Sequence, residues 1–309
     1  MKRQTPKTLP KIIVVLGPTA TGKSDLAVHL ALKFNGEIIS ADSRQVYRGM
    51  DIGSGKITET ETKGVPHHLL DVADPRKRVY NADEFRKDGA AAITDILSRG
   101  RLPIIAGGTG FYIDALVSGE VFPEVAPDQK LRDRLAKKSA TALMKEISRL
   151  DPRRARALDP LNKVRIIRAI EIARTLGSVP KVKSRKLYET LYIGLNLPTE
   201  RLRERIHLRL MKRMEGGKMV REISRLRTSG MTWKRLFALG LEYRYLSLYL
   251  RKRLSKEEML LELEKEIAQY ARRQMQWFKR NENVTWLSPG ENAKAAQKAR
   301  KFLSTDKSL

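Results

Sequence analysis

The stretch IIVVLGPTATGKSDLAVHLALK, residues 12–33, decides how the first part of this chain folds. Its opening run, residues 12–16, is apolar and β-branched, which is typical of a buried strand. Residues 24–33 repeat apolar side chains at helical spacing, at Leu26, Ala27, Leu30 and Ala31. Between them, residues 17–24 fit the pattern G-x-x-x-x-G-K-[ST]. A strand, a glycine-rich turn and a helix in this order direct backbone N–H groups and a helix N-terminus at an anion, so we predict a phosphate-binding loop.

All residues of this loop are predicted to contact phosphate: Gly17, Pro18, Thr19, Ala20, Thr21, Gly22, Lys23 and Ser24. Lys23 adds a positive point charge, and the hydroxyl of Ser24 is placed to ligate Mg²⁺, which is the predicted cofactor. The pattern predicts a phosphate site. It leaves open whether the phosphates belong to a nucleotide such as ATP.

Strands and helices alternate beyond this loop. Further strands are predicted at residues 37–40, 69–72, 102–106, 191–197 and 285–287. This alternation predicts an α/β fold of the P-loop NTPase type, with a parallel sheet covered by helices on both faces. Ligands bind at the carboxyl ends of the strands in such sheets. Polar residues stand near these predicted ends: Asp42-Ser43, His67-His68 and Gly107-Gly108-Thr109.

Two of these groups have a functional and a structural interpretation. Asp42 could hold Mg²⁺ through water or accept a proton from a nucleophile. Asp42-Ser43 could equally form an Asx turn or a helix cap. Gly107 and Gly108 could let the backbone approach a ligand beside the Thr109 hydroxyl, or could simply form a tight turn. Position in the sequence does not separate these alternatives.

The composition of the 309 residues points to a polyanionic partner. Lys and Arg number 62 and Asp and Glu 35, a formal net charge of +27, which favours nucleic acid as a partner. The absence of cysteine excludes disulfides and cysteine-ligated metal sites. Apolar runs are too short for a membrane span, so we expect a cytoplasmic protein without membrane contact.

Three segments are predicted along the chain. Residues 1–122 form the first part of the core, residues 123–188 an inserted all-helical domain, and residues 189–309 a return to the core followed by C-terminal helices. Basic residues outnumber acidic ones in the insertion, as expected of a surface that faces a polyanion. Within it, one buried helix face is predicted at Val164, Ile166, Ile167 and Ile170.

The C-terminal part is predicted to be mainly helical. A long amphipathic helix at residues 199–227 is interrupted at Gly216-Gly217, another helix covers residues 256–279, and the tail from residue 292 forms one further helix. Aromatic and basic residues mix near the end of the second helix, a combination that is useful for nucleic-acid contact. Because Trp277 and Phe278 are adjacent, we expect at least one of them to pack in the core.

Six segments carry a resemblance to a known family: GPTATGKS at 17–24, ADSRQVYRGMDIGSGK at 41–56, PHHLLD at 66–71, AGGTGFY at 106–112, RIIRAIEI at 165–172 and YARRQMQWF at 270–278. With them the chain resembles the tRNA dimethylallyltransferase (isopentenyl-tRNA transferase) family over residues 11 to 290. The eukaryotic relatives have a zinc finger that cannot exist here without cysteine, so the resemblance is to the bacterial type.

The resemblance implies an enzyme that transfers a dimethylallyl group from dimethylallyl diphosphate to a tRNA. The acceptor would be the exocyclic N6 amine of the adenosine 3′ of the anticodon, position 37, giving N6-isopentenyladenosine and diphosphate. The loop at 17–24 would then cradle the donor diphosphate, Asp42 would be the general base, and Thr109 would bond near the reacting amine. A monomer is expected.

The same resemblance implies a set of contacts with the tRNA anticodon stem-loop: Asp42, Ser43, Arg44, Gln45, Thr109, Arg132, Val164, Arg165, Ile166, Ile167 and Arg168. Three places depart from the family pattern. Leu161-Asn162 stands where Asn-Asp is usual, Ile267-Ala268 where Thr-Arg is common, and Leu241-Glu242 where Tyr-Lys is expected after Gly240. The last change removes a basic residue expected beside the diphosphate.

Three other functions are weighed against this one. A small-molecule P-loop kinase and an adenylate isopentenyltransferase would gain nothing from a charge of +27 and a large basic insertion. A non-catalytic RNA-binding protein with a degenerate loop is disfavoured by the intact Gly22, Lys23, Ser24 and Asp42.

Overall fold

The computed structural model describes residues 9–77, 79–119, 122–181 and 185–305. The chain divides into two compact units, Met1–Gly119 with Lys186–Leu309, and Glu120–Arg185. No helix among the described residues is long and apolar enough to cross a membrane.

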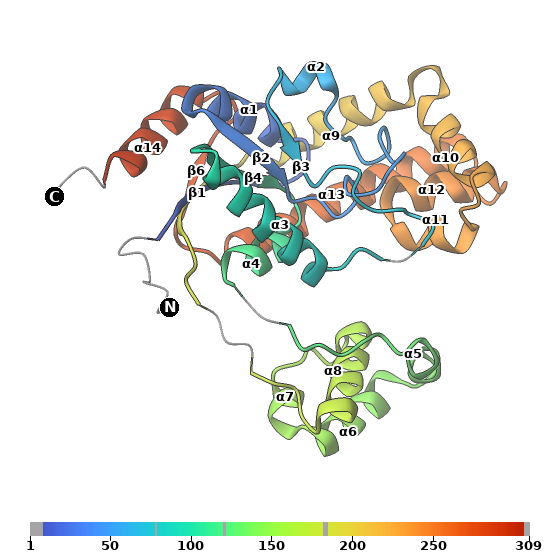
Figure 1. Cartoon of the computed structure of the whole chain (residues 1–309). Coiled ribbons are helices and arrows are strands. Elements are labelled where there is room, and N and C mark those ends of the chain that lie inside the picture. The colour runs from blue at the N-terminus through green and yellow to red at the C-terminus, as the bar shows by residue number, and fades with distance from the viewer. Residues whose placement is uncertain (1–8, 78, 120–121, 182–184, 306–309) are drawn as a thin grey trace. The chain divides into compact units, whose positions relative to one another are not determined.

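The larger unit is built on a six-stranded parallel sheet with the strand order β3-β2-β4-β1-β5-β6 (Figure 1). The strands are β1 (Lys11–Leu16), β2 (Gly36–Ser40), β3 (His67–His68), β4 (Leu102–Gly107), β5 (Glu189–Leu195) and β6 (Val284–Leu287). Ile13 of the central strand lies opposite Ile104 on one side and Leu191 on the other. The predicted α/β fold with a parallel sheet is confirmed.

The third strand differs from its prediction. The structure places β3 at His67–His68, where it pairs with Ile38 and Ile39, and residues 69–72 form no strand. Leu69 and Asp71 have φ angles of 62° and 56°, in the left-handed region. Such residues turn the chain and end an extended segment, so the prediction from the apolar letters at 69–72 is wrong.

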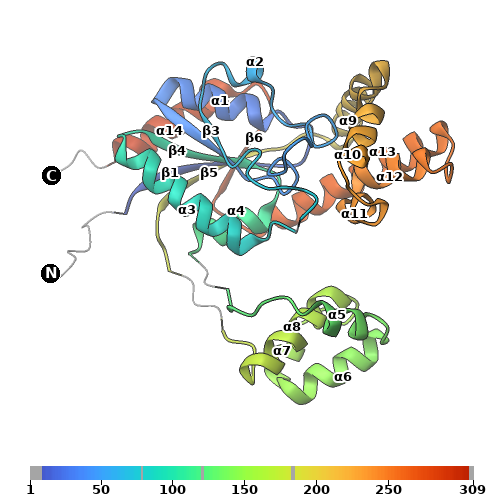
Figure 2. The same cartoon turned by 45° about the vertical axis from the view of Figure 1, so that its right-hand side comes forward.

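Helices cover both faces of the sheet (Figure 2). Helices α1 (Lys23–Phe34) and α14 (Asn292–Ser304) lie on one face, and α3 (Ala82–Ser98) and α4 (Gly110–Val117) on the other. Ile13 and Val15 belong to the buried cluster that also holds Leu30 of α1 and Ala295 of α14. Since side chains alternate along a strand, residues 12, 14 and 16 face the opposite layer. Every residue from 12 to 16 is buried, which is why this segment is apolar throughout.

A second group of helices follows β5. It comprises α9 (Thr199–Met214), a 3₁₀ turn (Glu215–Gly217), α10 (Lys218–Thr228), α11 (Trp233–Leu239), α12 (Leu241–Leu250) and α13 (Lys256–Phe278). The predicted break is confirmed, because Gly216 and Gly217 both have positive φ angles, of 56° and 69°. Phe278 is buried and Trp277 is half-buried, as expected for the adjacent pair. A short helix, α2 (Glu59–Thr62), precedes β3.

The smaller unit contains only helices in its described residues: α5 (Gln129–Ala136), α6 (Ala140–Leu150), α7 (Pro152–Arg156) and α8 (Lys163–Leu176). Leu143, Ile147, Ile166 and Ile170 form part of its core. Val164, predicted on the same buried face, is 79% exposed. It precedes Ile166 by two residues, about 200° around a helix, and therefore lies on the opposite side.

Candidate active site

The glycine-rich loop joins the end of β1 to the start of α1 in the predicted way. Gly17, Ala20 and Gly22 have φ angles of 144°, 62° and 90°. A Cβ atom at Gly17 would lie 2.5 Å from the carbonyl oxygen of Leu195, so only glycine fits there. The buried hydroxyl of Thr21 donates to the carbonyl of Pro18 at 2.8 Å and braces the turn from within.

Lys23 is the first residue of α1, and its ammonium group donates to the carbonyl of Pro18 at 2.6 Å. Burial and, to a smaller extent, the nearby charge of Arg209 lower the pKa of Lys23 to about 7. A bound phosphate would oppose both effects because it favours the protonated form. The charge of this lysine is therefore sensitive to whether an anion lies in the loop.

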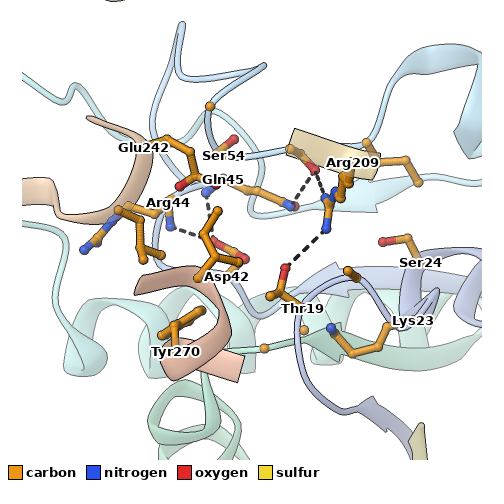
Figure 3. A pocket seen from close by; sticks show the side chains of 18 of the residues that line it. Thr19, Lys23, Ser24, Asp42, Arg44, Gln45, Ser54, Arg209, Glu242 and Tyr270 are labelled. Carbon is orange, nitrogen blue, oxygen red and sulfur yellow. Dashed lines mark hydrogen bonds between the residues drawn. The ribbon is translucent and has the colours of Figure 1, made fainter. Parts of the chain in front are cut away.

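The loop forms one wall of a cavity of about 640 Å³. Figure 3 shows Lys23 and Ser24 on one side of this pocket, Asp42 and Arg44 on the other, and Thr19 between them. Further segments contribute lining, among them residues 53–55, helix α9, residues 239–242 and helix α13. The pocket thus stands at the carboxyl ends of β1, β2 and β4, where a parallel sheet binds its ligands.

Asp42 lines this pocket and also forms the turn that follows β2. Its Oδ1 atom accepts the backbone N–H groups of Arg44 at 2.8 Å and Gln45 at 3.3 Å. The two interpretations of Asp42 are therefore compatible, since one oxygen holds the turn. Both bonds end on Oδ1. Within the described part of the chain no hydrogen bond ends on Oδ2, so this oxygen can face a ligand.

Thr109 is tied to the same turn from behind. Its hydroxyl oxygen accepts the N–H of Ser43 at 3.0 Å, and its own N–H donates to Ala41 at 3.1 Å. Tyr270 of α13 interacts with the Thr109 side chain, and burial together with the charge of Asp42 raises the pKa of Tyr270 to about 12. Tyr270 lines the pocket, whereas Thr109 stands one layer behind the lining.

Helix α9 supplies basic residues that the sequence patterns did not single out. Arg205, Arg209 and Arg213 recur at every fourth position and all line the pocket. Arg209 donates to the hydroxyl of Thr19 at 3.3 Å and to the carbonyl of Gly55 at 3.4 Å. Burial and the neighbouring Arg213 lower the pKa of Arg209 to about 10. Several cations in one pocket are suited to a polyphosphate. Their four-residue spacing places them on one face of the helix but does not by itself distinguish a site from a solvated surface.

Gln274 of α13 connects the two glycine-rich segments. Its side-chain oxygen accepts the N–H of Thr19 at 2.8 Å, and its nitrogen donates to the carbonyl of Gly108 at 2.7 Å. Gln274 is 6% exposed, so both bonds are shielded from water. This residue fixes the phosphate-binding loop against the turn after β4.

Two departures from the family pattern lie in the pocket. Ile267 lines it, and Glu242 is a buried acid among the arginines. Burial raises the pKa of Glu242, whereas Arg213, which donates to it at 3.3 Å, lowers it. Position 242 thus holds the partner of Arg213 in place of an additional cation. At the third departure, Leu161 is 85% exposed in the smaller unit.

The predicted tRNA contacts of the smaller unit have unequal surroundings. Arg132 donates two bonds to the buried carboxylate of Glu171, at 3.0 Å and 2.8 Å, and Arg168 pairs with the same group. Arg165 and Val164 are exposed. Ile166 is fully buried, so its side chain belongs to the core of this unit and cannot be a surface contact. The predicted contact set as a whole stays a prediction.

The similarity of this chain to known proteins points to the same family as its sequence motifs. The IPP transferase family model matches residues 45–281. The chain belongs to this family. A protein named tRNA dimethylallyltransferase 2 from Citrifermentans bemidjiense is 44% identical over 292 residues, which are 92% of each chain. A tRNA dimethylallyltransferase from Roseiflexus sp. is 40% identical over 296 residues, 93% of this chain and 96% of the relative.

Two solved structures of IPP transferase relatives share the fold. The full-length tRNA isopentenylpyrophosphate transferase from Bacillus halodurans superposes with a TM-score of 0.71 at 34% identity, covering 95% of this chain and 98% of its own. A eukaryotic dimethylallyltransferase acting on tRNA gives a TM-score of 0.79 at 27% identity, covering 94% and 77%. The predicted family resemblance is confirmed.

Proposed function

We propose that this chain transfers the dimethylallyl group of dimethylallyl diphosphate to N6 of adenosine 37 in tRNA. The bond between the allylic carbon and the diphosphate oxygen breaks, and its electron pair leaves with diphosphate. A bond forms between that carbon and N6, and N6 loses a proton. The observation that carries this proposal is one pocket in which a phosphate-binding loop and the α9 arginines face a carboxylate, Asp42.

The diphosphate of the donor would lie on the loop at residues 17–24. Its backbone N–H groups, the ammonium of Lys23 and the guanidinium of Arg209 would receive the phosphate oxygens. These groups stabilise the negative charge that grows on the leaving diphosphate, which lowers the barrier to departure. Arg205 and Arg213 extend the same positive surface.

Mg²⁺ fits this pocket as a companion of the diphosphate. The Ser24 hydroxyl lines the pocket, and a hydroxyl together with phosphate oxygens makes the hard oxygen donor set that Mg²⁺ prefers. No cluster of three or more His, Cys, Asp or Glu that could hold a metal occurs among the described residues, so phosphate and water would complete the coordination. When bound, the ion supplies neutralisation of phosphate charge.

The acceptor amine would meet the allylic carbon on the side of Asp42. The Asp42 carboxylate accepts the N6 proton. Its Oδ1 atom is engaged in the turn, so its Oδ2 atom is the one that can face the amine. Thr109 and Tyr270 hold this turn and the adenine position. The backbone at Ser43, Arg44 and Gln45 continues the same wall and would contact the flanking nucleotides.

The smaller unit would hold the anticodon stem-loop through phosphate contacts. Arg165 is exposed near the start of α8, and Lys163, the first residue of this helix, adds a second charge. Such contacts recognise the shape and the phosphates of RNA. Arg132 and Arg168 would contribute with the donors that Glu171 does not occupy.

The test uses dimethylallyl diphosphate labelled in the allyl group, Mg²⁺, and unmodified tRNA with adenosine at position 37. We expect label in the tRNA and none on free AMP. Label on AMP would instead indicate an adenylate isopentenyltransferase. Consumption of ATP in place of the donor would indicate a kinase, and either result would refute the proposal.

A further inference from the structure

A carboxylate outside the pocket holds one of its walls. Glu222 of α10 is 3% exposed. Its Oε2 atom accepts the backbone N–H groups of Asp51 at 2.9 Å and Ile52 at 2.6 Å, and its Oε1 atom accepts that of Gly53 at 3.0 Å. The hydroxyl of Tyr243 donates to Oε1 at 3.0 Å. Three successive amides therefore converge on one buried side chain from a helix that is 170 residues away in the sequence.

The geometry of the held segment allows little freedom. A Cβ atom at Gly53 would lie 2.9 Å from the Tyr243 ring and 3.1 Å from Glu222, so the backbone lies directly against both of them. Two residues on, Gly55 has a φ angle of 61°, and a Cβ there would overlap the guanidinium groups of Arg209 and Arg213. Residues 51–55 therefore contact α10 and α12 on one side and α9 on the other.

The carbonyl of Gly55 connects this segment to both halves of the pocket. It accepts a hydrogen bond from Arg209 at 3.4 Å and one from the side-chain nitrogen of Gln45 at 3.2 Å. Arg209 in turn contacts Thr19 in the phosphate-binding loop, and the backbone of Gln45 contacts Asp42. One carbonyl therefore orients a residue on the donor side and a residue on the acceptor side.

We propose that Glu222 is a positioning residue for the transfer reaction: by fixing residues 51–53 it places the Gly55 carbonyl, which aims Arg209 at the donor diphosphate and holds Gln45 beside Asp42. The assignment rests on the proposed function for the identity of the donor. A carboxylate is suited to this task because it can accept all of the converging bonds, and an unmade bond to a buried amide is costly.

Other buried carboxylates give a contrast. Glu37 is fully buried and pairs with Arg99, Arg101 and His68, at the start of β2. Its partners are side chains, and none of them lines the pocket. Loss of the Glu37 charge should therefore lower the stability of the fold without moving the pocket, which makes it a matched control for Glu222.

The experiment compares Glu222→Gln, Tyr243→Phe and Glu37→Gln in the full chain. Hydrogen–deuterium exchange is followed for residues 51–55, and steady-state kinetics give kcat and the KM for dimethylallyl diphosphate at saturating tRNA. Gln keeps the size of Glu222 but offers one acceptor oxygen and turns an NH₂ group toward amide donors. We expect at least roughly tenfold faster exchange at residues 51–53 and a donor KM at least roughly tenfold higher.

Tyr243→Phe keeps the three amide bonds but removes the hydroxyl that donates to Oε1, the atom that accepts the N–H of Gly53. We therefore expect a smaller rise in exchange, at residue 53, and a donor KM about threefold higher, and this variant keeps the test open even if Glu222→Gln does not fold. Glu37→Gln should lower the Tm with the exchange of residues 51–55 and the donor KM unchanged. Unchanged exchange at residues 51–53 in the Glu222 and Tyr243 variants, or a loss of activity explained by the folded fraction alone, would overturn the assignment. Failure of the wild-type chain to use dimethylallyl diphosphate would refute the proposed function, and the exchange data would still report on Glu222.

Discussion

Arg209 donates a hydrogen bond to the hydroxyl of Thr19 at 3.3 Å, and this contact joins helix α9 to the phosphate-binding loop across 190 residues of sequence. The loop supplies N–H groups and one ammonium, and the helix supplies the guanidinium groups. The pocket is therefore a composite of the P-loop core and the helices that follow β5.

Replacement of Arg209 by Ala should weaken donor binding and slow transfer. A hydrogen bond to a charged group contributes about 1.5–3 kcal/mol, so kcat/KM for the donor should fall roughly 10- to 150-fold. Arg203→Ala is the matched control, because Arg203 lies on the same helix, is exposed and is outside the pocket lining. Equal effects of the two substitutions would show that Arg209 acts only through the net charge of the helix.

Donor binding should take up a proton through Lys23. Its pKa is lowered to about 7 in the structure, so at pH 8 most of this side chain is neutral. Bound diphosphate favours the ammonium form, and protonation becomes harder as the pH rises above 7. The affinity for dimethylallyl diphosphate should therefore fall with rising pH, by up to about tenfold per unit.

Calorimetry in two buffers of different ionisation enthalpy measures this proton uptake directly. Lys23→Met gives the contribution of the donor's own titration, which is subtracted. If the proton uptake at pH 8 is the same in Lys23→Met and the wild-type chain, Lys23 is not the group that titrates.

Substitution of Asp42 by Asn separates its two roles. The amide oxygen of Asn can still accept the N–H groups of Arg44 and Gln45, so the turn and the Tm should be preserved. The proton acceptor is lost, and general-base catalysis contributes about 10²- to 10⁴-fold, so kcat should fall by that order while donor affinity changes little. A kcat close to that of the wild-type chain would assign the proton to another group.

In the smaller unit, Arg132 and Arg165 should respond differently to removal. Arg132→Ala leaves the buried Glu171 without its bidentate partner, and the Tm should drop, with a cost of roughly 1–3 kcal/mol because Arg132 is partly exposed. Arg165→Ala should leave the Tm unchanged and reduce the affinity for tRNA. Titrations of tRNA binding against salt measure the second effect, because each lost phosphate contact lowers the salt dependence.

The local order of strand, loop and helix at residues 12–33 was predictable because the strand is an unbroken apolar run, the helix repeats its apolar residues at helical spacing, and the loop has glycines where the backbone needs them. Asp42 and Thr109 could be placed near the phosphate site because the ends of neighbouring parallel strands meet. The third strand could not be located from residues 69–72, since the hydrophobic pattern does not predict the left-handed backbone at Leu69 that ends the strand.

The α9 arginines were missed for a different reason. Arg205 and Arg209 lie on a helix whose docking position depends on the packing of the helices after β5, and its polar face is indistinguishable by pattern from a solvated one. The fully buried Ile166 shows the converse, because a motif shared with a family does not separate the residues that pack from those that touch RNA. Glu222 is identified only by three backbone amides that converge on it in space.

The central claim is that Asp42 and the phosphate-binding loop act in one pocket to prenylate adenosine 37. Nucleoside mass spectrometry of tRNA incubated with dimethylallyl diphosphate and the enzyme tests it most directly. The account predicts N6-isopentenyladenosine at position 37 with the wild-type chain, and its loss with Asp42→Asn although the donor still binds. Unmodified adenosine at position 37 after incubation with the folded, donor-binding wild-type chain would contradict it.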